Sequence, residues 1–569
     1  APAPSRAQAA AEPDLGTEEQ RAAGKVVYDK WCAQCHGDDG AGEGIAAPYV
    51  HPKPRDFTSA KYKIRSTRNG SLPTDADLRG VIRDGIPATA MPAFPELSNT
   101  EVTNLVYYLK SFAEDDFSDP SAYSDPFEFP GPPPFSEDSL ETGFQTYVEI
   151  GCAQCHGELG RGDGKTAPTL RDDWGHFIRA ADLTMPWTFR AGGTREAIFK
   201  TLTTGFNGTP MAGFADGLTQ EQRWQIVDWI VAQAEGRTEA PYTNLLKAVG
   251  TTADLSFGQG LETVRQAFDE APPALFPVIG QIMEPGRAFH PSVVALEVRS
   301  VYDGDEIAFL VTWHDMKAEV SGHNGPDLDV PLDEETTGLP EVAQAEAAQA
   351  VETDIWGNPV GGAAEAQPEQ VAPADPWAQD AGTAAAAEAV PESEFSDAVA
   401  IQLPLELREG VAKPYFLLGD PQYPVHLWFV DLAQPESVQV WEGRGSANLT
   451  PAAGEPPEVL AGYDRGEWAV IFKRPRRVTS GVAFAEGEFV PVAFSVWDGF
   501  AEERGSKRGL TRWVHVYLDP LEKPSVWGPM IQAFLTVLLI ELLIIGLVRW
   551  RQRRAAAKPA PKASEAKTA

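Results

Sequence analysis

The pentapeptide CAQCH occurs twice, at residues 32–36 and 152–156, and the two copies contain every cysteine of the 569-residue chain. C-x-x-C-H is the attachment signature for c-type haem. The two thiols form thioethers with the porphyrin vinyl groups, which requires them to lie on one turn of helix, and the adjacent histidine reaches the iron. The motif therefore predicts two haem c groups, held by Cys32, Cys35, Cys152 and Cys155 and ligated by His36 and His156.

Other chemistries also use paired cysteines. A lone CxxC is typical of thioredoxin-like redox proteins, but the surrounding sequence lacks the necessary βαβ pattern. Two CxxC pairs can bind zinc, although structural zinc sites usually place the pairs much closer in sequence. A disulfide or a chance occurrence is the remaining alternative. None of these accounts for the repeated histidine, so haem attachment is favoured.

The sixth iron ligand is predicted from the same internal repeat. The spacing between Cys32 and Cys152 is 120 residues, and so is the spacing between Met91 in ATAMPAF and Met211 in GTPMAGF. Met185 in LTMPW competes for the second iron, but its counterpart in the first copy is Arg65. A buried methionine is more often core filler than a ligand, yet the shared spacing favours Met91 and Met211.

A capped helical stretch follows each methionine. SNTE (98–101) precedes VTNLVYYLKSF, and TQE (219–221) precedes QRWQIVDWIVAQ, each with apolar residues at helical spacing. With these motifs the chain resembles tandem class I cytochromes c over residues 20–115 and 140–236. The resemblance implies small all-helical domains with a CxxCH helix, a Met loop and a C-terminal aromatic helix. His/Met ligation fills both axial positions, so we expect these domains to carry electrons without transforming substrates.

Alternating strand patterns begin at about Leu245. VVALEVRSVY (293–302) and IAFLVTWHDM (307–316) flank a DGDE turn and predict a β-hairpin. Further strand-like runs cover residues 399–407, 425–432, 468–475, 489–499 and 511–518. Short strands separated by Gly and Pro turns predict an antiparallel sandwich.

Three segments of this region, VYDGDEIAFLVTWHD, PYFLLGDPQYPVHLWFVDL and AFSVWDGFAEERGSKRGLTRW, resemble the haem-binding γ subunit of ethylbenzene dehydrogenase and related molybdenum enzymes. The resemblance implies a haem b between a methionine and a lysine, in a subunit that relays electrons to or from the iron–sulfur subunit of a molybdopterin oxidoreductase. Lys507 falls in the lysine position, but Leu418 stands where the methionine is expected, and leucine cannot ligate iron. His426 and Met316 are alternative ligands. A third haem, of b type, and a domain that serves docking alone both remain open.

Residues 526–548, VWGPMIQAFLTVLLIELLIIGLV, are long enough to cross the roughly 30 Å of membrane hydrocarbon as a helix. Trp527 and Trp550 mark its ends, and four arginines between Arg549 and Arg554 follow. The positive-inside rule therefore predicts a cytoplasmic tail at 549–569 and a periplasmic location for the bulk of the chain. A buried core helix is the alternative. The start APAPSRAQAAAEP has no signal region, so we expect a leader to have been removed already.

The chain has 47 basic and 82 acidic residues, which makes nucleic acid or an anionic membrane surface an unfavourable partner and favours basic electron carriers. No Lys or Arg occurs between Lys317 and Arg408, where Ala, Pro, Glu and Gln dominate. We expect a disordered acidic insertion at about 322–395, a disordered N-terminus at 1–19 and a Pro-rich linker at 116–139.

The sequence thus predicts a multidomain protein with two all-α cytochrome c domains (20–115 and 140–240), one mainly-β antiparallel sandwich (245–520) and one transmembrane helix. The favoured function is a membrane-anchored, non-catalytic electron-transfer subunit. Its expected partners are a molybdopterin/iron–sulfur oxidoreductase acting on nitrite, nitrate or a similar substrate, and a soluble cytochrome c, a terminal oxidase or a quinol-oxidising complex. The alternatives are a dihaem peroxidase or thiosulfate-oxidising cytochrome, which needs an open iron, and a docking adaptor.

Overall fold

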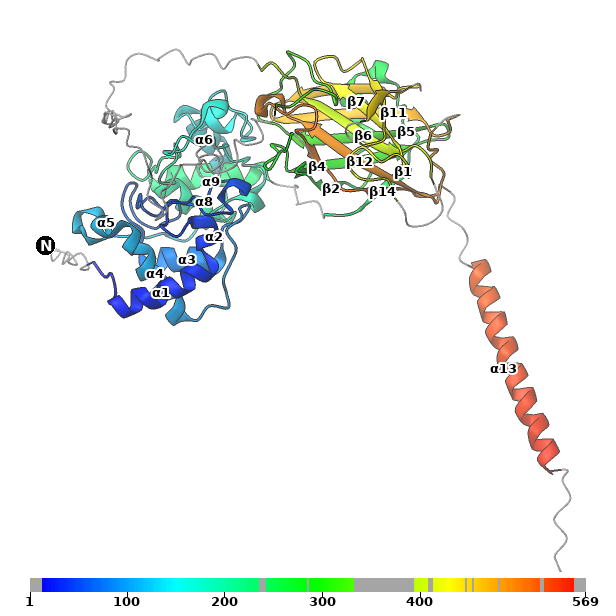
Figure 1. The fold of residues 1–569 in the computed structure, drawn as a ribbon, viewed down its shortest axis with the longest axis horizontal. Coiled ribbons are helices and arrows are strands. Elements are labelled where there is room, and N and C mark those ends of the chain that lie inside the picture. Colours follow the sequence, from blue (N-terminus) through cyan, green and yellow to red (C-terminus); the bar gives the residue numbers. More distant parts are fainter. Residues whose placement is uncertain are drawn as a thin grey trace, which may run out of the picture. The chain divides into compact units, whose positions relative to one another are not determined.

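The computed structural model describes residues 13–234, 242–283, 286–331, 393–407, 413–445, 448–452, 455–478, 481–521 and 527–556. The chain divides into two compact units, residues 1–518 and 519–569. Two helical domains and a β domain form the first unit, and one long helix forms the second (Figure 1). Most of the predicted acidic insertion and residues 1–12 lie outside the described residues.

The first helical domain surrounds the first CAQCH motif. Its helices are α1 (Glu18–Trp31), α2 (Ala33–His36), α3 (Asp75–Asp84), α4 (Asn99–Lys110) and α5 (Glu114–Ser118). The predicted cap of α4 is confirmed, because Ser98 and Glu101 form a reciprocal capping box. Helices α1 and α4 pack closely at Gly24, where an added Cβ would lie 2.0 Å from the carbonyl oxygen of Asn104.

The second helical domain repeats this arrangement. Its helices are α6 (Glu137–Glu149), α7 (Ala153–His156), α8 (Arg195–Thr204) and α9 (Gln220–Gln233). Thr219 caps α9 and forms a capping box with Gln222. Gly143 allows α6 to approach α9, since an added Cβ would lie 2.1 Å from the carbonyl oxygen of Gln225. Each domain therefore has a close helix crossing next to its CxxCH turn, between α1 and α4 in the first domain and between α6 and α9 in the second.

The β domain follows, with one short helix, α10 (Leu261–Gln266). Its strands are β1 (Leu245–Gly250), β2 (Ala274–Pro277), β3 (Ile279–Gly280), β4 (Ala295–Tyr302), β5 (Glu306–His314), β6 (Ala398–Pro404), β7 (Val425–Asp431), β8 (Gln439–Gly443), β9 (Leu449–Pro451), β10 (Glu458–Asp464), β11 (Glu467–Pro475), β12 (Phe489–Trp497), β13 (Gly509–Leu510) and β14 (Val514–Leu518). The predicted hairpin is confirmed, since β4 and β5 pair antiparallel.

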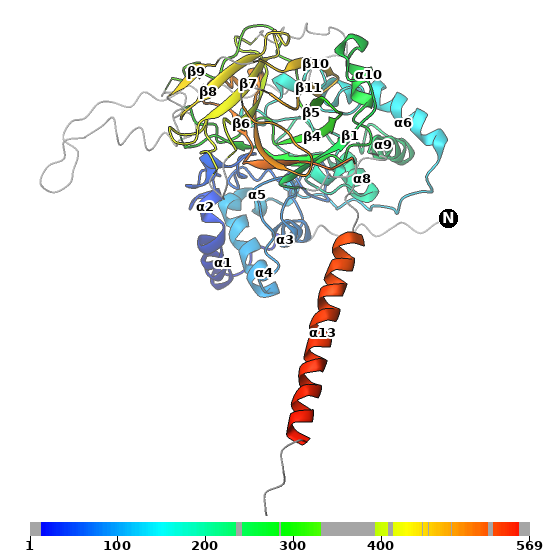
Figure 2. The ribbon, with the colours of Figure 1, turned by 90° about the vertical axis from the view of Figure 1, so that its right-hand side faces the viewer.

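Strand β12 joins two groups of strands around one core. Figure 2 labels members of both groups, β6 to β9 in one and β1, β4, β5, β10 and β11 in the other. Its first half pairs with β14, in the order β10-β11-β5-β4-β1-β14, and its second half pairs with β6, which continues to β7, β8 and β9. The two groups face each other: Phe276 of β2 stacks on Phe494 at 5.8 Å, and Arg474 of β11 lies 5.0 Å from the ring of Trp428 in β7. This two-layer packing has the form of a sandwich.

The expectation of a purely antiparallel sandwich is wrong at one strand. β1 pairs parallel with both β4 and β14, so the sheet is mixed, although most of its pairs are antiparallel. β1 follows the second helical domain and lies between β4 and β14. No hairpin joins β1 to either strand, so it is not required to run antiparallel to them.

Helix α13 (Trp527–Ala556) covers the predicted span except Val526, which lies outside the described residues. It is long and apolar enough to cross a membrane, with a mean hydropathy of 2.5 over its most apolar window. The guanidinium of Arg554 lies 4.1 Å from the ring of Trp550, so a basic residue and an interfacial aromatic meet at its C-terminal end.

Candidate haem-binding sites

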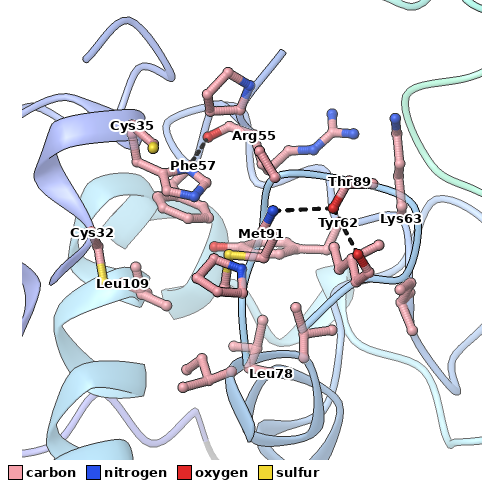
Figure 3. Close-up of a pocket in the computed structure, with 18 of the residues that line it drawn as sticks. Cys32, Cys35, Arg55, Phe57, Tyr62, Lys63, Leu78, Thr89, Met91 and Leu109 are labelled. Atoms are coloured by element: carbon pink, nitrogen blue, oxygen red, sulfur yellow. Dashed lines mark hydrogen bonds between the residues drawn. The ribbon is translucent and has the colours of Figure 1, made fainter. Parts of the chain in front are cut away.

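One pocket of the first helical domain brings together the predicted haem ligands of that domain. Cys32, Cys35 and His36 line it from the CxxCH turn, and Met91 lines it from the loop between α3 and α4 (Figure 3). Leucine, isoleucine and aromatic side chains form most of the remaining wall. The pocket thus combines two thiols, an imidazole and a thioether in an apolar setting, which is the donor set of a His/Met haem c.

The imidazole of His36 is held in one orientation. Its Nδ1 lies 2.9 Å from the carbonyl oxygen of Arg55, and its ring stacks on Phe57 at 4.4 Å. A carbonyl oxygen only accepts, so Nδ1 carries the proton and Nε2 keeps its lone pair for a metal. Burial lowers the pKa of His36, which favours the neutral imidazole that binds iron.

The loop that carries Met91 is fixed by its own backbone. The N–H of Met91 donates to Oγ1 of Thr89 (3.1 Å), and its carbonyl oxygen accepts from the N–H of Ile86 (3.1 Å). Gly85 ends α3 with a φ of 67°, and an added Cβ there would lie 2.8 Å from the carbonyl oxygen of Met91. A glycine is therefore required where the loop turns back towards the pocket.

The second domain reproduces these contacts. The Nδ1 of His156 lies 2.9 Å from the carbonyl oxygen of Ala181. The N–H of Met211 donates to Oγ1 of Thr209 (3.3 Å), and its carbonyl oxygen accepts from Phe206 (2.9 Å). Burial lowers the pKa of His156 as it does that of His36. Met211 and Cys152 pack against one hydrophobic cluster, whereas the rival Met185 precedes a 3-10 turn at Pro186–Thr188.

The cysteines do not fit the alternative chemistries. All four are free thiols, and each pair lies in its own domain, so the two pairs do not form one zinc site. Burial raises the pKa of Cys32 to about 12 and that of Cys152 to about 11. A redox-active CxxC instead needs a thiol whose pKa is lowered.

Four cationic side chains line the first pocket, and the sequence did not single them out as site residues: Lys53, Arg55, Lys63 and Arg190. Burial, with nearby Arg190 and Arg55, lowers the pKa of Lys63 to about 7, and burial lowers that of Arg55 to about 10. Among the residues that the structure describes, Lys63 and Arg190 form no ion pair. Partly buried cations are stabilised by anionic partners, and the two propionates of a haem would supply them.

The second helical domain contributes directly to this pocket. Arg190 and Phe206 of that domain are among the lining residues. Across the same boundary, the guanidinium of Arg55 lies 4.4 Å from the ring of Trp174, and the Nε1–H of Trp174 donates to Asp56 (3.0 Å). These residues are recognisable only from the packing of the two domains, because the sequence gives no sign that the domains touch.

The region of the predicted haem b has a different character. Leu418 is 1% exposed and belongs to an apolar cluster with Trp497 and Phe429. The backbone N–H of Lys507 donates to the carbonyl oxygen of Arg504 (2.8 Å). Trp497 donates from Nε1 to the carbonyl oxygen of Gly505, so the Lys507 loop and the Leu418 cluster meet at this tryptophan. Ligation of a haem by Lys507 stays a prediction.

The β domain contacts the second helical domain close to its CxxCH turn. The guanidinium of Arg161 donates to the carbonyl oxygens of Asp464 and Arg465, both at 3.1 Å. The Nε2 of His314 lies 2.5 Å from the carbonyl oxygen of Arg161, and Phe177 lies 5.7 Å from Phe500. The second haem-binding candidate therefore adjoins the β domain.

Comparison with known proteins supports the cytochrome assignment. Residues 19–109 and 138–230 match the family model described as cytochrome C oxidase, cbb3-type, subunit III. These two segments coincide with the two helical domains. The helical part of the chain is therefore a cytochrome c region, and domains of this type bind haem.

A curated protein and a solved structure are similar to parts of the chain. The chain is 29% identical over 129 residues to a candidate respiratory nitrate reductase heme subunit, ORF7, of Haloferax mediterranei, covering 22% of this chain and 45% of that protein. The chain thus spans about half the length of this curated relative. A chain from the reducing HAO-like protein complex of Kuenenia stuttgartiensis is 36% identical, with 39% of this chain and 99% of that chain covered and a TM-score of 0.36.

A further structural similarity is weak. A family 9 carbohydrate binding module from Caldicellulosiruptor kristjanssonii, solved with glucose, is 8% identical with a TM-score of 0.23 and covers 50% of this chain and 99% of its own. A similarity at this level has no bearing on function.

Proposed function

We propose that this cytochrome c protein carries two covalently bound haem c groups and transfers electrons between a redox enzyme and the respiratory chain. Cys32 and Cys35 would hold the first haem, with His36 and Met91 as axial ligands. The corresponding residues of the second domain, Cys152, Cys155, His156 and Met211, would hold the second. The observation that carries the proposal is the convergence of both thiols, His36 and Met91 on one apolar pocket.

The haem would supply a one-electron iron couple, and the protein residues set the conditions for it. The carbonyl groups of Arg55 and Ala181 orient the two histidines, so that each presents Nε2. The hydrogen-bonded methionine loops hold Met91 and Met211 in equivalent positions, which leaves no open axial site for a substrate. Because these ligands are held rigidly, we expect the structure around the iron to change little when an electron is transferred. A non-catalytic role is therefore favoured.

The packing of the two domains supports transfer between their haems. Phe206 lies in the turn that leads to Met211 and also lines the first pocket. Arg65 of the first domain is 1% exposed and donates to the carbonyl oxygens of Thr204 and Gly205 in the second. The second methionine loop is thus fixed against the first pocket. This arrangement suits electron transfer between two haems.

The external partners are inferred from chemistry and from the relatives. The resemblance of the β domain to the ethylbenzene dehydrogenase γ subunit supports a molybdopterin/iron–sulfur oxidoreductase as partner. The similarity to a respiratory nitrate reductase heme subunit of Haloferax supports a nitrate or nitrite type. The excess of acidic residues suits a basic soluble cytochrome c on the other side, with a terminal oxidase or quinol-oxidising complex as alternatives. Helix α13 would anchor the protein, with the bulk of the chain in the periplasm.

A reductive titration under carbon monoxide tests this function. The protein should accept two electrons per chain, and the reduced form should bind no carbon monoxide at neutral pH because both axial positions are filled. Carbon monoxide binding by the wild-type protein would instead favour the dihaem peroxidase alternative, which requires an open iron.

A further inference from the structure

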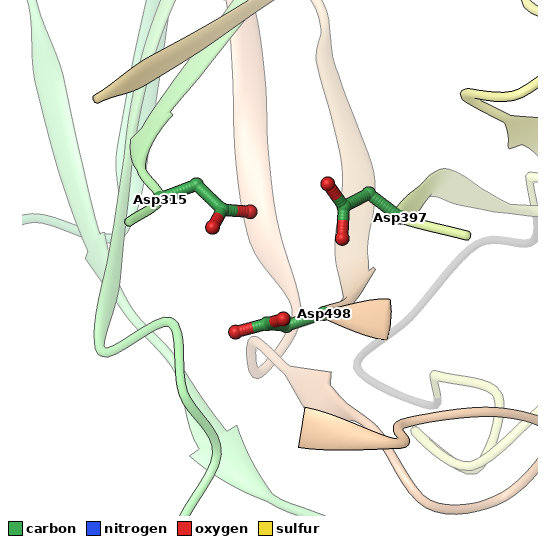
Figure 4. Close-up of side chains that lie close together, drawn as sticks. All are labelled: Asp315, Asp397 and Asp498. Atoms are coloured by element: carbon green, nitrogen blue, oxygen red, sulfur yellow. The ribbon is translucent and has the colours of Figure 1, made fainter. Parts of the chain in front are cut away.

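Three aspartates from separate parts of the sequence come together in the β domain. Asp315 directly follows β5, Asp397 directly precedes β6, and Asp498 directly follows β12. One carboxylate oxygen from each lies within 4.8 Å of the others, and the three residues are 4%, 0% and 5% exposed. Figure 4 shows the carboxyl groups directed towards a common space.

The neighbouring backbone orients two of these carboxylates. Asp397 accepts from the N–H groups of Glu319 and Gly499, both at 2.8 Å, and from Nε1 of Trp468 at 3.0 Å. Asp498 accepts from the N–H of Ala501 at 3.2 Å. These groups are therefore held in place and still have unused lone pairs, since an ionised carboxylate offers about four acceptor sites.

Asp315 has an oxygen without a partner. Its Oδ1 accepts from the N–H of Lys317 (3.1 Å), but its Oδ2 is buried and makes no hydrogen bond. A buried carboxylate oxygen that makes no hydrogen bond is unfavourable, because the atom has lost its contact with water and gained no partner. This atom belongs to the side chain that faces Asp397 and Asp498, so it points to a ligand in the space between them.

Two further buried carboxylates lie near the cluster. Glu319 pairs with Lys317 at 2.5 Å, and Glu503 accepts from the N–H of Asp498. Lys317 and Arg179 are positive groups that act on these carboxylates. Buried carboxylates close to one another require either protons or a bound cation.

We propose that Asp315, Asp397 and Asp498 bind a Ca²⁺ ion that ties together the ends of β5, β6 and β12. The ligand atoms are all hard oxygens, which Ca²⁺ and Mg²⁺ prefer. Ca²⁺ bonds oxygen at about 2.3–2.6 Å and accepts flexible geometry, whereas Mg²⁺ requires about 2.0–2.1 Å and a near-ideal octahedron. The three oxygens lie within 4.8 Å of one another and come from the ends of three separate strands, an arrangement that the flexible geometry of Ca²⁺ accommodates.

Metal analysis and thermal unfolding of the haem-loaded full chain test the proposal. The wild-type protein should hold one more Ca²⁺ per chain than Asp315→Asn. We expect this difference both after dialysis in Ca²⁺-free buffer and after saturation of the two proteins with Ca²⁺. CaCl₂ should raise the unfolding midpoint of the β domain relative to EGTA, and Asp315→Asn should abolish that rise. MgCl₂ at the same concentration should give a smaller rise.

Asp228→Asn is the matched control, because Asp228 is an equally buried aspartate that pairs with Arg195 in the second helical domain. It should lower the unfolding midpoint without changing the Ca²⁺ response. Three results would overturn the proposal: no bound Ca²⁺ and no rise in the wild type, an unchanged Ca²⁺ response in Asp315→Asn, or an equal effect of Mg²⁺. If Asp315→Asn does not fold, the Ca²⁺ response of the wild-type protein is compared with that of Asp498→Asn, which should also lack the rise in the unfolding midpoint.

Discussion

Arg65 of the first cytochrome c domain donates a hydrogen bond to the carbonyl oxygen of Thr204, the last residue of α8 in the second domain. Its other terminal nitrogen donates to the carbonyl oxygen of Gly205. The last carbonyls of a helix lack intrahelical partners and carry partial negative charge, so a buried arginine is well suited to satisfy them. One domain therefore caps a helix of the other.

Replacing Arg65 with methionine should loosen this interdomain contact. Hydrogen bonds from a charged donor contribute about 1.5–3 kcal/mol each, so we expect a loss of about 3 kcal/mol, or about 6–12 °C in the unfolding midpoint of the helical domains. Circular dichroism in the Soret band measures that midpoint. Arg68→Met is the control: its ion pair with Asp216 is exposed and should contribute less than about 1 kcal/mol. Equal effects of the two substitutions would contradict the capping role.

On the proposed ligation by Met91 and Met211, replacing either methionine should open one iron. In each single variant, Met91→Leu or Met211→Leu, the reduced protein should bind carbon monoxide at one of its two haems. The ferric protein should lose half of the red charge-transfer absorption of Met-ligated haem. Met185→Leu serves as the control and should leave both properties unchanged. Loss of ligation in Met185→Leu, with none in Met211→Leu, would reassign the second ligand.

Arg190 should raise the reduction potential of the first haem, although it belongs to the second domain. Arg190→Gln removes a buried positive charge from the first pocket, which stabilises the ferric form. We expect the potential of the first haem to fall by tens of millivolts, the size of a unit-charge interaction across about 10–15 Å at an effective dielectric constant of about 20. Spectroelectrochemistry measures the two potentials. Exposed Lys165→Gln should change neither, and a fall at the second haem alone would refute the assignment.

Without Ca²⁺, the stability of the β domain should decrease as the pH rises, and bound Ca²⁺ should reduce this decrease. Burial, with Asp498 next in effect, raises the pKa of Glu503 to about 8, and burial with neighbouring carboxylates also raises the pKa values of Asp315 and Asp397. The native state then holds more protons than the unfolded state, so stability without Ca²⁺ falls as the pH rises from about 4.5 to 8. Other charged groups in and around the cluster are Glu319, Lys317 and Arg179.

Ca²⁺ binds the deprotonated carboxylates, so its stabilising effect should grow with pH. We expect the rise in the unfolding midpoint on adding CaCl₂ to be at least twice as large at pH 8 as at pH 5. Differential scanning calorimetry at both pH values measures it. A rise that is independent of pH would mean that Ca²⁺ binds elsewhere.

The sequence predicts local features of this protein well because residues close together in the chain determine them. The CxxCH turns, the methionine loops and the caps of α4 and α9 are set in this way. The β4–β5 hairpin is local in the same sense, and its alternating pattern predicts it correctly. The repeat of 120 residues relates Met91 to Met211, and the two methionine loops have matching backbone hydrogen bonds.

Features built from distant segments could not be predicted in this way. Arg65 and Arg190 matter because two domains pack together, and nothing in their neighbouring residues indicates it. The parallel strand β1 depends on where the chain enters the sheet. Asp315, Asp397 and Asp498 each end or begin a separate strand, and only the fold of the sheet brings their carboxylates together.

Quantification of covalent and extractable haem tests the central claim most directly. A pyridine haemochrome spectrum should give two covalent haems per chain, and acid–acetone extraction measures separately any haem that is not covalently bound. Alanine in place of Cys32 and Cys35 should remove one covalent haem, and alanine in place of Cys152 and Cys155 the other. One extractable haem would show that the β domain binds haem b, with Lys507 as the candidate ligand. Fewer than two covalent haems in the wild-type protein would contradict the account.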